Sequence, residues 1–400
     1  MTVLDIKEQH LLWDKQHSYP IHARKTHHDI NLDPDRPLRI GVVSPEFCRH
    51  VVGYAVIKLF ENYNHLDFEL YCYSQGNTSD DYTERFKQSC SSWLDVFNLS
   101  DEELANRIVT DRIDILIHTP GHTAGSRLKA MSLKPAPIQI SWPGYIETTG
   151  VSAIDYMIGD HYITPLGCED LYSEKILRLP DNIVCVDTPT YDITVGTLPA
   201  LQNGYMTFGC FNNPVKINSE VISVWSKALD ALPTSKLVLK YRGITSTTNR
   251  ERILSEFTNN RIDPERIELE DYSPSLEDLY RRYNDIDIAF DCFPFSGGAT
   301  TYDALWMGVP VITLPGQRPS SRLSLSRIEN VGLQEFIAHD ASDFVAIALK
   351  FANDLNKLAC IRDGLRERVE KSPMQDGPRF AEAFSNLMRE TWKSFVMERN

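Results

Sequence analysis

Short hydrophobic runs alternate with amphipathic segments along most of this chain. In the first half the runs are separated by helical patterns over residues 54–63 and 101–110, and they read L-R-I-G-V-V, F-E-L-Y-C-Y and I-D-I-L-I-H-T. The second half repeats the rhythm from residue 205 with Y-M-T-F-G-C-F, K-L-V-L-K-Y, R-I-E-L and D-I-A-F-D. This alternation predicts parallel sheets that are covered by helices on both faces.

The two series predict an α/β protein with two Rossmann-like domains facing a cleft. Ligands of such sheets bind at the carboxyl ends of the strands. We expect five segments, which are an N-terminal arm (residues 1–36), a first Rossmann-like domain (37–187), a linker (188–204), a second Rossmann-like domain (205–372) and a C-terminal helix (373–400).

Composition argues against several classes of protein. The 400 residues carry a formal net charge of −14, which argues against non-specific binding to nucleic acid. No apolar run reaches the ~20 residues of a membrane span, and the N-terminus lacks a signal-peptide pattern. The eight cysteines form no C-x-x-C pair, which argues against a zinc site and favours a reducing, cytoplasmic location.

The segment from Phe293 to Asp303, F-P-F-S-G-G-A-T-T-Y-D, lies between a predicted strand and a predicted helix. The start of a helix offers backbone N–H groups and a partial positive charge, and glycines allow phosphate oxygens to approach closely. Thr300 and Thr301 are suited to cap the helix or to add hydroxyl donors, and Asp303 is suited to accept ribose hydroxyls. The residues alone leave two interpretations, a phosphate cradle or a plain turn with a threonine cap.

Three further positions follow predicted strands. Lys216, after F-G-C-F-N-N-P-V, is placed to neutralise a diphosphate, although a surface lysine would give the same pattern. His122 and Thr123 lie in the glycine-bounded loop G-H-T-A-G, where the histidine either contacts a substrate or packs as a hydrogen-bonded core residue. His50 lies in a strand-to-helix loop, the usual place for a site residue in this architecture.

Seven sequence blocks occur in order between residue 38 and the C-terminus. They are V-S-P-E-F-x-x-H, G-H-T-A-G-x-R-L, P-A-P-I-Q-x-x-W-x-G-Y-x-x-T-T-G, D-Y-x-I-x-D, S-E-K-x-x-R-L-P, F-G-x-F-N-N-x-x-K-I and D-x-F-P-F-x-G-x-x-T-T-x-D-A-L-W-M-G-V-P-V. The series resembles the catalytic region of the O-GlcNAc transferase family, which includes plant SPINDLY-type protein O-fucosyltransferases and bacterial homologues. The match is highly specific for the family and less specific for the sugar.

The resemblance implies a GT-B fold, with the acceptor side in the first domain and the nucleotide-sugar in the second. It implies inverting, metal-independent transfer of a sugar to Ser or Thr of a protein acceptor, with UDP-GlcNAc as the leading donor and no other cofactor. Use of UDP-glucose or GDP-fucose stays open, as does a catalytically weak nucleotide-binding homologue. The sequence does not contain the tetratricopeptide array that precedes this region in the family. Two interpretations stay open: the chain is a fragment of a longer protein, or acceptor choice rests on the cleft and the arm.

The resemblance also implies roles for individual residues. Lys216 would contact the diphosphate and Asp303 would hold the ribose. Either His50 or Asp114, which occupies the position of a second site histidine, would assist proton removal. The expected catalytic residues are His50, Asp114 and Lys216, the expected substrate-binding residues are His122, Thr123, Asn213, Gly297, Gly298, Thr300, Thr301 and Asp303, and no metal ligand is expected.

Besides Asp114, three positions depart from the family's pattern. Gly298 and Ala299 stand where relatives read G-H-T-T or G-T-T-T, so one histidine or hydroxyl contact is lost at the helix start. Leu279 replaces a histidine, which weakens the inference that a base stacks at that position.

Overall fold

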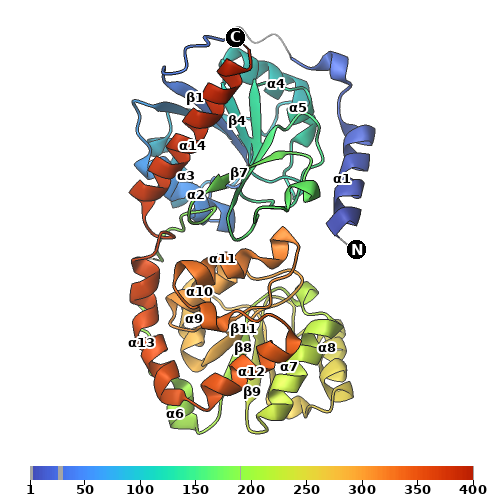
Figure 1. Cartoon of the computed structure of the whole chain (residues 1–400), viewed down its shortest axis with the longest axis vertical. Coiled ribbons are helices and arrows are strands. Elements are labelled where there is room, and N and C mark those ends of the chain that lie inside the picture. The colour runs from blue at the N-terminus through green and yellow to red at the C-terminus, as the bar shows by residue number, and fades with distance from the viewer. Residues whose placement is uncertain (1–2, 26–29, 190, 400) are drawn as a thin grey trace. The chain divides into compact units, whose positions relative to one another are not determined.

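The computed structural model describes residues 3–25, 30–189 and 191–399. The chain divides into two compact units, each built on its own parallel sheet (Figure 1). Unit 1 comprises Met1–Thr188 and Pro373–Asn400, and unit 2 comprises Pro189–Ser372. The C-terminal helix, which the sequence analysis set apart as a segment of its own, thus groups with unit 1.

Unit 1 contains a seven-stranded sheet in the order β3-β2-β1-β4-β5-β6-β7, and every neighbouring pair is parallel. Register places Val42 opposite Cys72 on one side and Ile117 on the other. Because the strand order reverses beside β1, the carboxyl ends of β1 and β4 mark the place where such sheets bind ligands. The strands are β1 (Leu38–Ser44), β2 (Phe68–Ser74), β3 (Ser92–Asp95), β4 (Ile115–His118), β5 (Ile138–Ser141), β6 (Tyr156–Asp160) and β7 (Lys175–Leu179).

Helices cover both faces of this sheet (Figure 1). Two of them begin with capping boxes, in which Asp80 and Ser100 accept the backbone N–H of the third helical residue. Phe47, Phe60 and Phe86 pack edge to face in the core, with ring centroids 5.0–5.9 Å apart. The helices are α1 (Val3–His17), α2 (Val51–Asn62), α3 (Asp81–Ser89), α4 (Asp101–Thr110), α5 (Leu128–Ser132) and α14 (Gly377–Met397), with short 3-10 turns at Ile21–Ala23 and Glu169–Leu171.

Helix α14 closes the core of unit 1. The Trp142 ring lies 5.3 Å from the Phe384 ring, and Trp142 Nε1 donates a hydrogen bond to the Ile183 carbonyl at 2.7 Å. The buried Trp392 donates its Nε1–H to the Asp33 carbonyl at 3.2 Å. The C-terminal helix thereby fixes the segment that leads into β1.

Unit 2 contains a five-stranded parallel sheet in the order β10-β9-β8-β11-β12. Its strands are β8 (Thr207–Cys210), β9 (Lys236–Lys240), β10 (Ile267–Glu270), β11 (Ile288–Phe290) and β12 (Val311–Ile312). Its helices are α6 (Pro199–Asn203), α7 (Ser219–Ala231), α8 (Thr247–Asn259), α9 (Leu276–Arg282), α10 (Ala299–Trp306), α11 (Leu323–Asn330), α12 (Ala341–Ala352) and α13 (Leu355–Glu370), and 3-10 turns cover Pro214–Lys216, Pro264–Arg266, Tyr283–Asp285, Pro319–Ser321 and Gln334–Phe336.

One face of α7 packs into the core of unit 2. Ile222, Trp225 and Leu229 lie on this face and are all fully buried. A buried guanidinium binds the start of the unit to its core, since Arg362 donates to the carbonyls of Gly196 at 2.8 Å and Ile286 at 2.6 Å.

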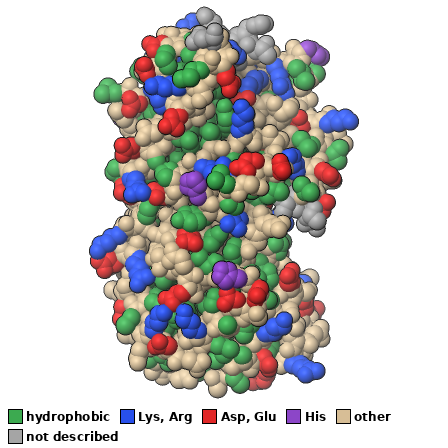
Figure 2. All heavy atoms as spheres, viewed as in Figure 1, with side chains coloured by type: hydrophobic (Ala, Val, Ile, Leu, Met, Phe, Trp, Pro, Cys, Tyr) green, Lys and Arg blue, Asp and Glu red, His purple; other side chains and the backbone are tan. Residues whose placement is uncertain are grey.

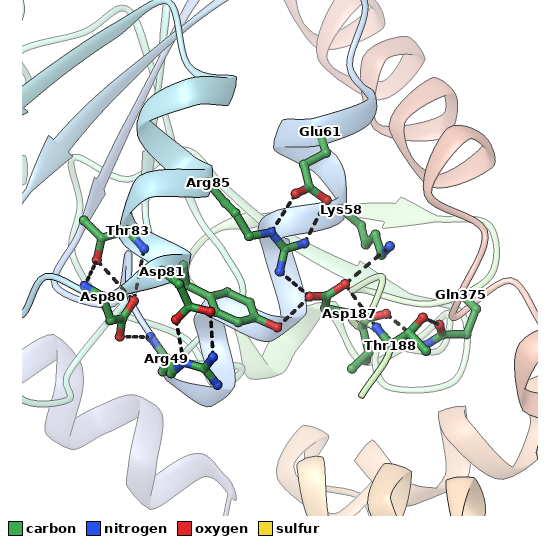
Figure 3. A network of polar contacts seen from close by, with 12 residues as sticks. Arg49, Lys58, Glu61, Asp80, Asp81, Thr83, Arg85, Asp187, Thr188 and Gln375 are labelled. Carbon is green, nitrogen blue, oxygen red and sulfur yellow. Dashed lines mark hydrogen bonds and ion pairs between the residues drawn. The ribbon is translucent and has the colours of Figure 1, made fainter. Parts of the chain in front are cut away.

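A polar network surrounds Asp187, close to the point at which the chain leaves unit 1 (Figure 3). The Asp187 carboxylate accepts hydrogen bonds from Tyr82 Oη and from Arg85, both at 2.5 Å, and lies 3.3 Å from Lys58 Nζ. Beside it, Thr188 Oγ1 donates to Gln375 Oε1 at 2.6 Å. The two points at which the chain leaves and re-enters unit 1 are therefore joined to each other inside that unit.

Acidic and basic side chains are interspersed over the face drawn in Figure 2. Among the described helices, none combines the length and the apolar character needed to cross a lipid bilayer.

Helix α1 packs against the loop that contains T-T-G. His10 Nδ1 donates to the Thr148 carbonyl at 2.8 Å, and the His10 ring stacks on the His122 ring at 4.1 Å. Gly150 has a φ of +69°, and a Cβ at this position would lie 2.5 Å from the carbonyl carbon of His10. The glycine therefore permits both the turn and the close approach of the helix.

Replacing Gly150 with Ala should displace α1 from unit 1. Gly167→Ala is the matched control, because Gly167 also has a positive φ but no atom within 4 Å of the added methyl group. Both changes incur the roughly 1–2 kcal/mol cost of a left-handed alanine, and only the first adds a clash with the helix. Limited trypsin digestion should cleave the Gly150→Ala protein within α1 roughly tenfold faster than the control; equal rates in the two variants would contradict this account.

Candidate active site

Two loops meet at the carboxyl edge of the unit 2 sheet. One follows β8 and covers residues 211–218, and the other follows β11 and covers residues 291–298. Since β8 and β11 are adjacent and parallel, the loops leave the same edge side by side. These loops and the first turn of α10 are called the loop cluster below.

Lys216 links the two loops. Its Nζ donates to the Ser296 carbonyl at 2.8 Å, lies 3.4 Å from Asn212 Oδ1, and sits 4.2 Å from the centre of the Phe295 ring. Burial lowers the pKa of the Lys216 ammonium, and the negative charge of Asp291 opposes this effect. Among the residues that the structure describes, no carboxylate forms an ion pair with Lys216, so its cation keeps hydrogen-bonding capacity for an anionic ligand.

The two asparagines of F-N-N-P have different roles. Asn212 is buried, and its Oδ1 accepts a hydrogen bond from Thr300 Oγ1 at 3.0 Å and faces Lys216. Asn213, the residue that the sequence analysis selected, caps the turn at Pro214–Lys216 by accepting the Val215 N–H at 3.0 Å. The side chain that connects Lys216 to the helix start is therefore Asn212.

A buried carboxylate supports the glycine turn from below. Asp291 Oδ1 accepts the N–H of Gly297 at 2.7 Å, and Oδ2 accepts the hydroxyl of Thr313 at 2.7 Å. A Cβ at Gly297 would lie 2.3 Å from Thr301 Oγ1. A glycine at position 297 therefore allows Thr301 to pack closely against the turn, and the N–H of Gly297 is already hydrogen-bonded to Asp291.

The two threonines at the start of α10 point in different directions. Thr301 is buried, and its hydroxyl lies 2.7 Å from Ser324 Oγ, so its side chain belongs to the interior. Gly298 is the N-cap, and only Leu323 Cδ1, at 3.8 Å, would meet a Cβ there. The first N–H groups of a helix have no partner within it, and the turn that starts at Ala299 presents them beside Lys216 and Thr300.

Asp303 lies one turn into α10 and is half-buried. Its Oδ1 accepts the hydroxyl of Tyr280 at 2.8 Å. Burial raises the pKa of Asp303 to about 7, although the Tyr280 hydrogen bond and the charge of Arg327 oppose the increase. The carboxyl group therefore changes its charge close to neutral pH.

In unit 1, His50 and Glu46 lie at the carboxyl end of β1. His50 is the N-cap of α2, with its Nδ1 3.3 Å from the Val52 N–H and 3.8 Å from Glu46 Oε1. Glu46 Oε2 lies 3.1 Å from Thr119 Oγ1, and Thr119 follows β4 at the same edge. Burial lowers the pKa of His50 and raises the pKa of Glu46.

The structure does not bring Asp114 to this edge. Asp114 directly precedes β4, at the amino end of the strand, where it is buried. Its two oxygens accept a forked pair of hydrogen bonds from Arg36, each at 2.7 Å, and Oδ2 also accepts the N–H of Arg39. The expectation that Asp114 assists catalysis is therefore replaced by a structural role in the fold.

His122 and Thr123 follow β4 as expected, but both side chains have partners within unit 1. His122 Nε2 donates to the Thr149 carbonyl at 2.7 Å, and its ring is stacked on His10. Thr123 Oγ1 donates to the Pro120 carbonyl at 2.7 Å. In this arrangement His122 joins α1 to the T-T-G loop.

Sequence reasoning missed four residues of these two edges. They are Asn212, Ser296, Tyr280 and Glu46. Asn212 and Glu46 lie inside quoted blocks, F-N-N-P and V-S-P-E-F, so the signal was present in the sequence. Ser296 contributes a backbone carbonyl, and Tyr280 comes from a different helix, so neither leaves a local pattern.

The two units, each with a parallel sheet, have the fold of GT-B glycosyltransferases. The fold is shared with HepE of Anabaena, solved in complex with UDP and glucose, at 12% identity and a TM-score of 0.51 over 88% of this chain and 99% of that one. The paired loops of unit 2, with a lysine and a helix start at the carboxyl ends of β8 and β11, lie where such sheets bind nucleotides.

The chain belongs to glycosyl transferase family 41, whose family model matches residues 6–191 and 189–384. An O-GlcNAc transferase of Thermobaculum terrenum, solved as a mutant, is 34% identical with a TM-score of 0.92 over all of this chain and 76% of that one. The tomato (Solanum lycopersicum) protein named "Probable UDP-N-acetylglucosamine--peptide N-acetylglucosaminyltransferase SPINDLY" is 32% identical over 97% of this chain. The chain spans about two-fifths of the length of that relative, 42%.

Removing the Asp114 carboxylate should destabilise unit 1 without affecting the chemistry. Asp114→Ala leaves Arg36 without its buried partner, and the loss of one member of such a pair lowers the free energy of unfolding by about 3 kcal/mol. Urea unfolding measures this change, with Glu84→Ala, which breaks an exposed ion pair to Lys87, as the control. If Asp114→Ala lowered the free energy of unfolding no more than Glu84→Ala does, the structural assignment would be wrong.

Replacing Asp303 with Asn should change how stability depends on pH. The folded-state pKa of about 7 lies above the ordinary value of 3.8, so the contribution of this group is fully present below about pH 4 and is lost as the pH rises through about 7. Asn has no such loss and can still accept the Tyr280 hydroxyl. The Tm of Asp303→Asn relative to the parent should therefore increase between about pH 5 and pH 8; a difference that is constant over this range would contradict the raised pKa.

Proposed function

We propose that this chain transfers a sugar from a nucleotide-sugar donor, with UDP-GlcNAc as the leading candidate, to Ser or Thr of a protein acceptor. The observation that carries this proposal is the position of Lys216. Its half-buried ammonium contacts Ser296 and Asn212, beside the first turn of α10. The names of the relatives, which describe peptide N-acetylglucosaminyltransferases, support the donor and the acceptor class.

The chemistry follows from where charge develops. When the bond between the anomeric carbon and the diphosphate oxygen breaks, its electron pair stays on the leaving diphosphate. A cation and helix N–H groups that are already in place stabilise this charge without rearranging during the reaction. We infer that Lys216, the first turn of α10 and the Thr300 hydroxyl supply this stabilisation and that no metal ion is needed for it.

The remaining parts of the donor are assigned by the same reasoning. Asp303, when ionised, is suited to accept the ribose hydroxyls, and Tyr280 fixes the orientation of its carboxylate. Attack by an acceptor hydroxyl on the face opposite to the leaving group would invert the anomeric centre. The proton of that hydroxyl needs an acceptor, and His50 at the carboxyl edge of unit 1 is the candidate.

The test is nucleotide release from a panel of donors. The purified 400-residue chain is incubated with UDP-GlcNAc, UDP-glucose or GDP-fucose and a Ser/Thr-containing peptide, and free nucleotide and modified peptide are measured. We expect release and peptide modification with UDP-GlcNAc. Preference for another donor would keep the reaction class and change the sugar, while no release by the folded protein with any donor would overturn the proposal.

Lys216→Ala should lower kcat by about 10²–10³, the usual effect of removing one group that stabilises transition-state charge. Lys227→Ala is the matched control, because Lys227 is an exposed lysine of α7 in the same unit. Circular dichroism confirms that both variants are folded. Unchanged turnover in Lys216→Ala would remove the diphosphate role of this lysine.

A further inference from the structure

The carboxylate of Glu46 is held in one orientation beside His50. Its side chain is only 12% exposed, although it lies at the ligand-binding edge of the sheet. The Thr119 hydroxyl lies 3.1 Å from Oε2 and 2.8 Å from Ser44 Oγ, so one oxygen of the carboxylate is fixed by a buried pair of hydroxyls. The other oxygen, Oε1, faces His50 Nδ1 at 3.8 Å.

His50 has two possible partners for Nδ1. In the structure Nδ1 accepts the Val52 N–H at 3.3 Å, and a neutral imidazole in this state carries its proton on Nε2. Such a ring cannot take a proton at Nε2. If Nδ1 instead bears the proton and donates it to Glu46 Oε1, Nε2 has a free lone pair. Closing the 3.8 Å gap to a normal hydrogen bond requires a shift of about 1 Å.

We propose that Glu46 is a positioning residue that stabilises the Nδ1–H tautomer of His50 and thereby makes Nε2 the proton acceptor. This inference rests on the proposed transferase reaction. In that reaction the acceptor O–H bond breaks and its proton moves to Nε2. The acceptor oxygen forms a bond to the anomeric carbon, and the electron pair of the bond from that carbon to the diphosphate stays on the diphosphate.

The groups around His50 and Glu46 leave Glu46 as the carboxylate that faces His50 Nδ1. The other charged and titratable groups at the turn are Arg49, Asp80, Asp81 and Cys48. Arg49 makes a bidentate ion pair with Asp81, and its N–H is donated to Asp80. Burial lowers the pKa of His50. An ionised carboxylate hydrogen-bonded to Nδ1–H would stabilise the imidazolium that forms during proton transfer.

The experiment reads the tautomer of His50 directly. The full chain labelled with ¹⁵N-histidine reports Nδ1 and Nε2 shifts, and the His50 signals are identified by their loss in His50→Gln. We expect a substantial Nδ1–H population in the unaltered protein at about pH 8, above the ordinary histidine pKa. In Glu46→Gln we expect this population to fall and the pKa of His50 to decrease, with no such change in the surface control Glu84→Gln.

Kinetics provide the second readout. Glu46→Gln should lower kcat by about 10²-fold or more with little change in the donor KM. Thr119→Val removes the hydroxyl that orients the carboxylate but keeps the carboxylate itself, so it should lower the Nδ1–H population of His50 by a smaller amount than Glu46→Gln. This variant provides the test if Glu46→Gln does not fold. A His50 that stays in the Nε2–H form in all of these proteins, or a kcat unaffected by Glu46→Gln, would overturn the inference. Absence of turnover in the unaltered chain would instead count against the proposed function, because the tautomer is measured without turnover.

Discussion

The buried carboxylate of Asp291 is the interaction on which the rest of the loop cluster depends. It ends β11, accepts the N–H groups of Cys292 and Gly297, and reaches the Thr313 hydroxyl after β12. Burial raises its pKa, and hydrogen bonds from Ser324, Thr313 and the Gly297 N–H, together with the charge of Lys216, oppose the increase. A charge that is this costly to bury must be surrounded by donors, and the donors come from the turn that leads into α10. Satisfying Asp291 therefore fixes the backbone that carries Ser296 and the helix start.

Lys216 depends on that backbone in turn. Its contacts are a carbonyl, an amide oxygen and the face of Phe295, none of which carries a full negative charge. A carboxylate at the same place would neutralise the ammonium and reduce its attraction for a diphosphate. The cluster thus separates two tasks, because Asp291 organises the turn from beneath while neutral groups hold the cation at the surface. The buried thiols of Cys210 and Cys292, 3.6 Å apart, fill the space under both loops with small apolar groups.

The fold could be predicted from the sequence because strands and helices leave local patterns of apolar and polar residues. The strand runs and the helical patterns between them follow from spacing within a few residues. The candidate site was predicted less completely, because its geometry depends on contacts between distant segments. The order of the blocks identified Lys216, Asp303 and His50, but spacing could not show that Asn212 rather than Asn213 bridges to Thr300. It could not show that Arg36 is the partner of Asp114, because the two residues are 78 positions apart in the sequence.

Each unit places a carboxylate just after a strand of its parallel sheet, but the two carboxylates have different surroundings. In unit 2 the buried Asp291 directly follows β11, its oxygens accept hydrogen bonds from Gly297 and Thr313, and Lys216 is the cation beside that turn. In unit 1, Glu46 follows β1, its Oε2 accepts the Thr119 hydroxyl, and its Oε1 lies 3.8 Å from His50 Nδ1. The two carboxylates therefore differ in how their oxygens are hydrogen-bonded, and this difference matches the different roles that we assign to them. Asp291 accepts hydrogen bonds on both oxygens, which suits a structural role, whereas Glu46, in our proposal, orients His50 for proton transfer.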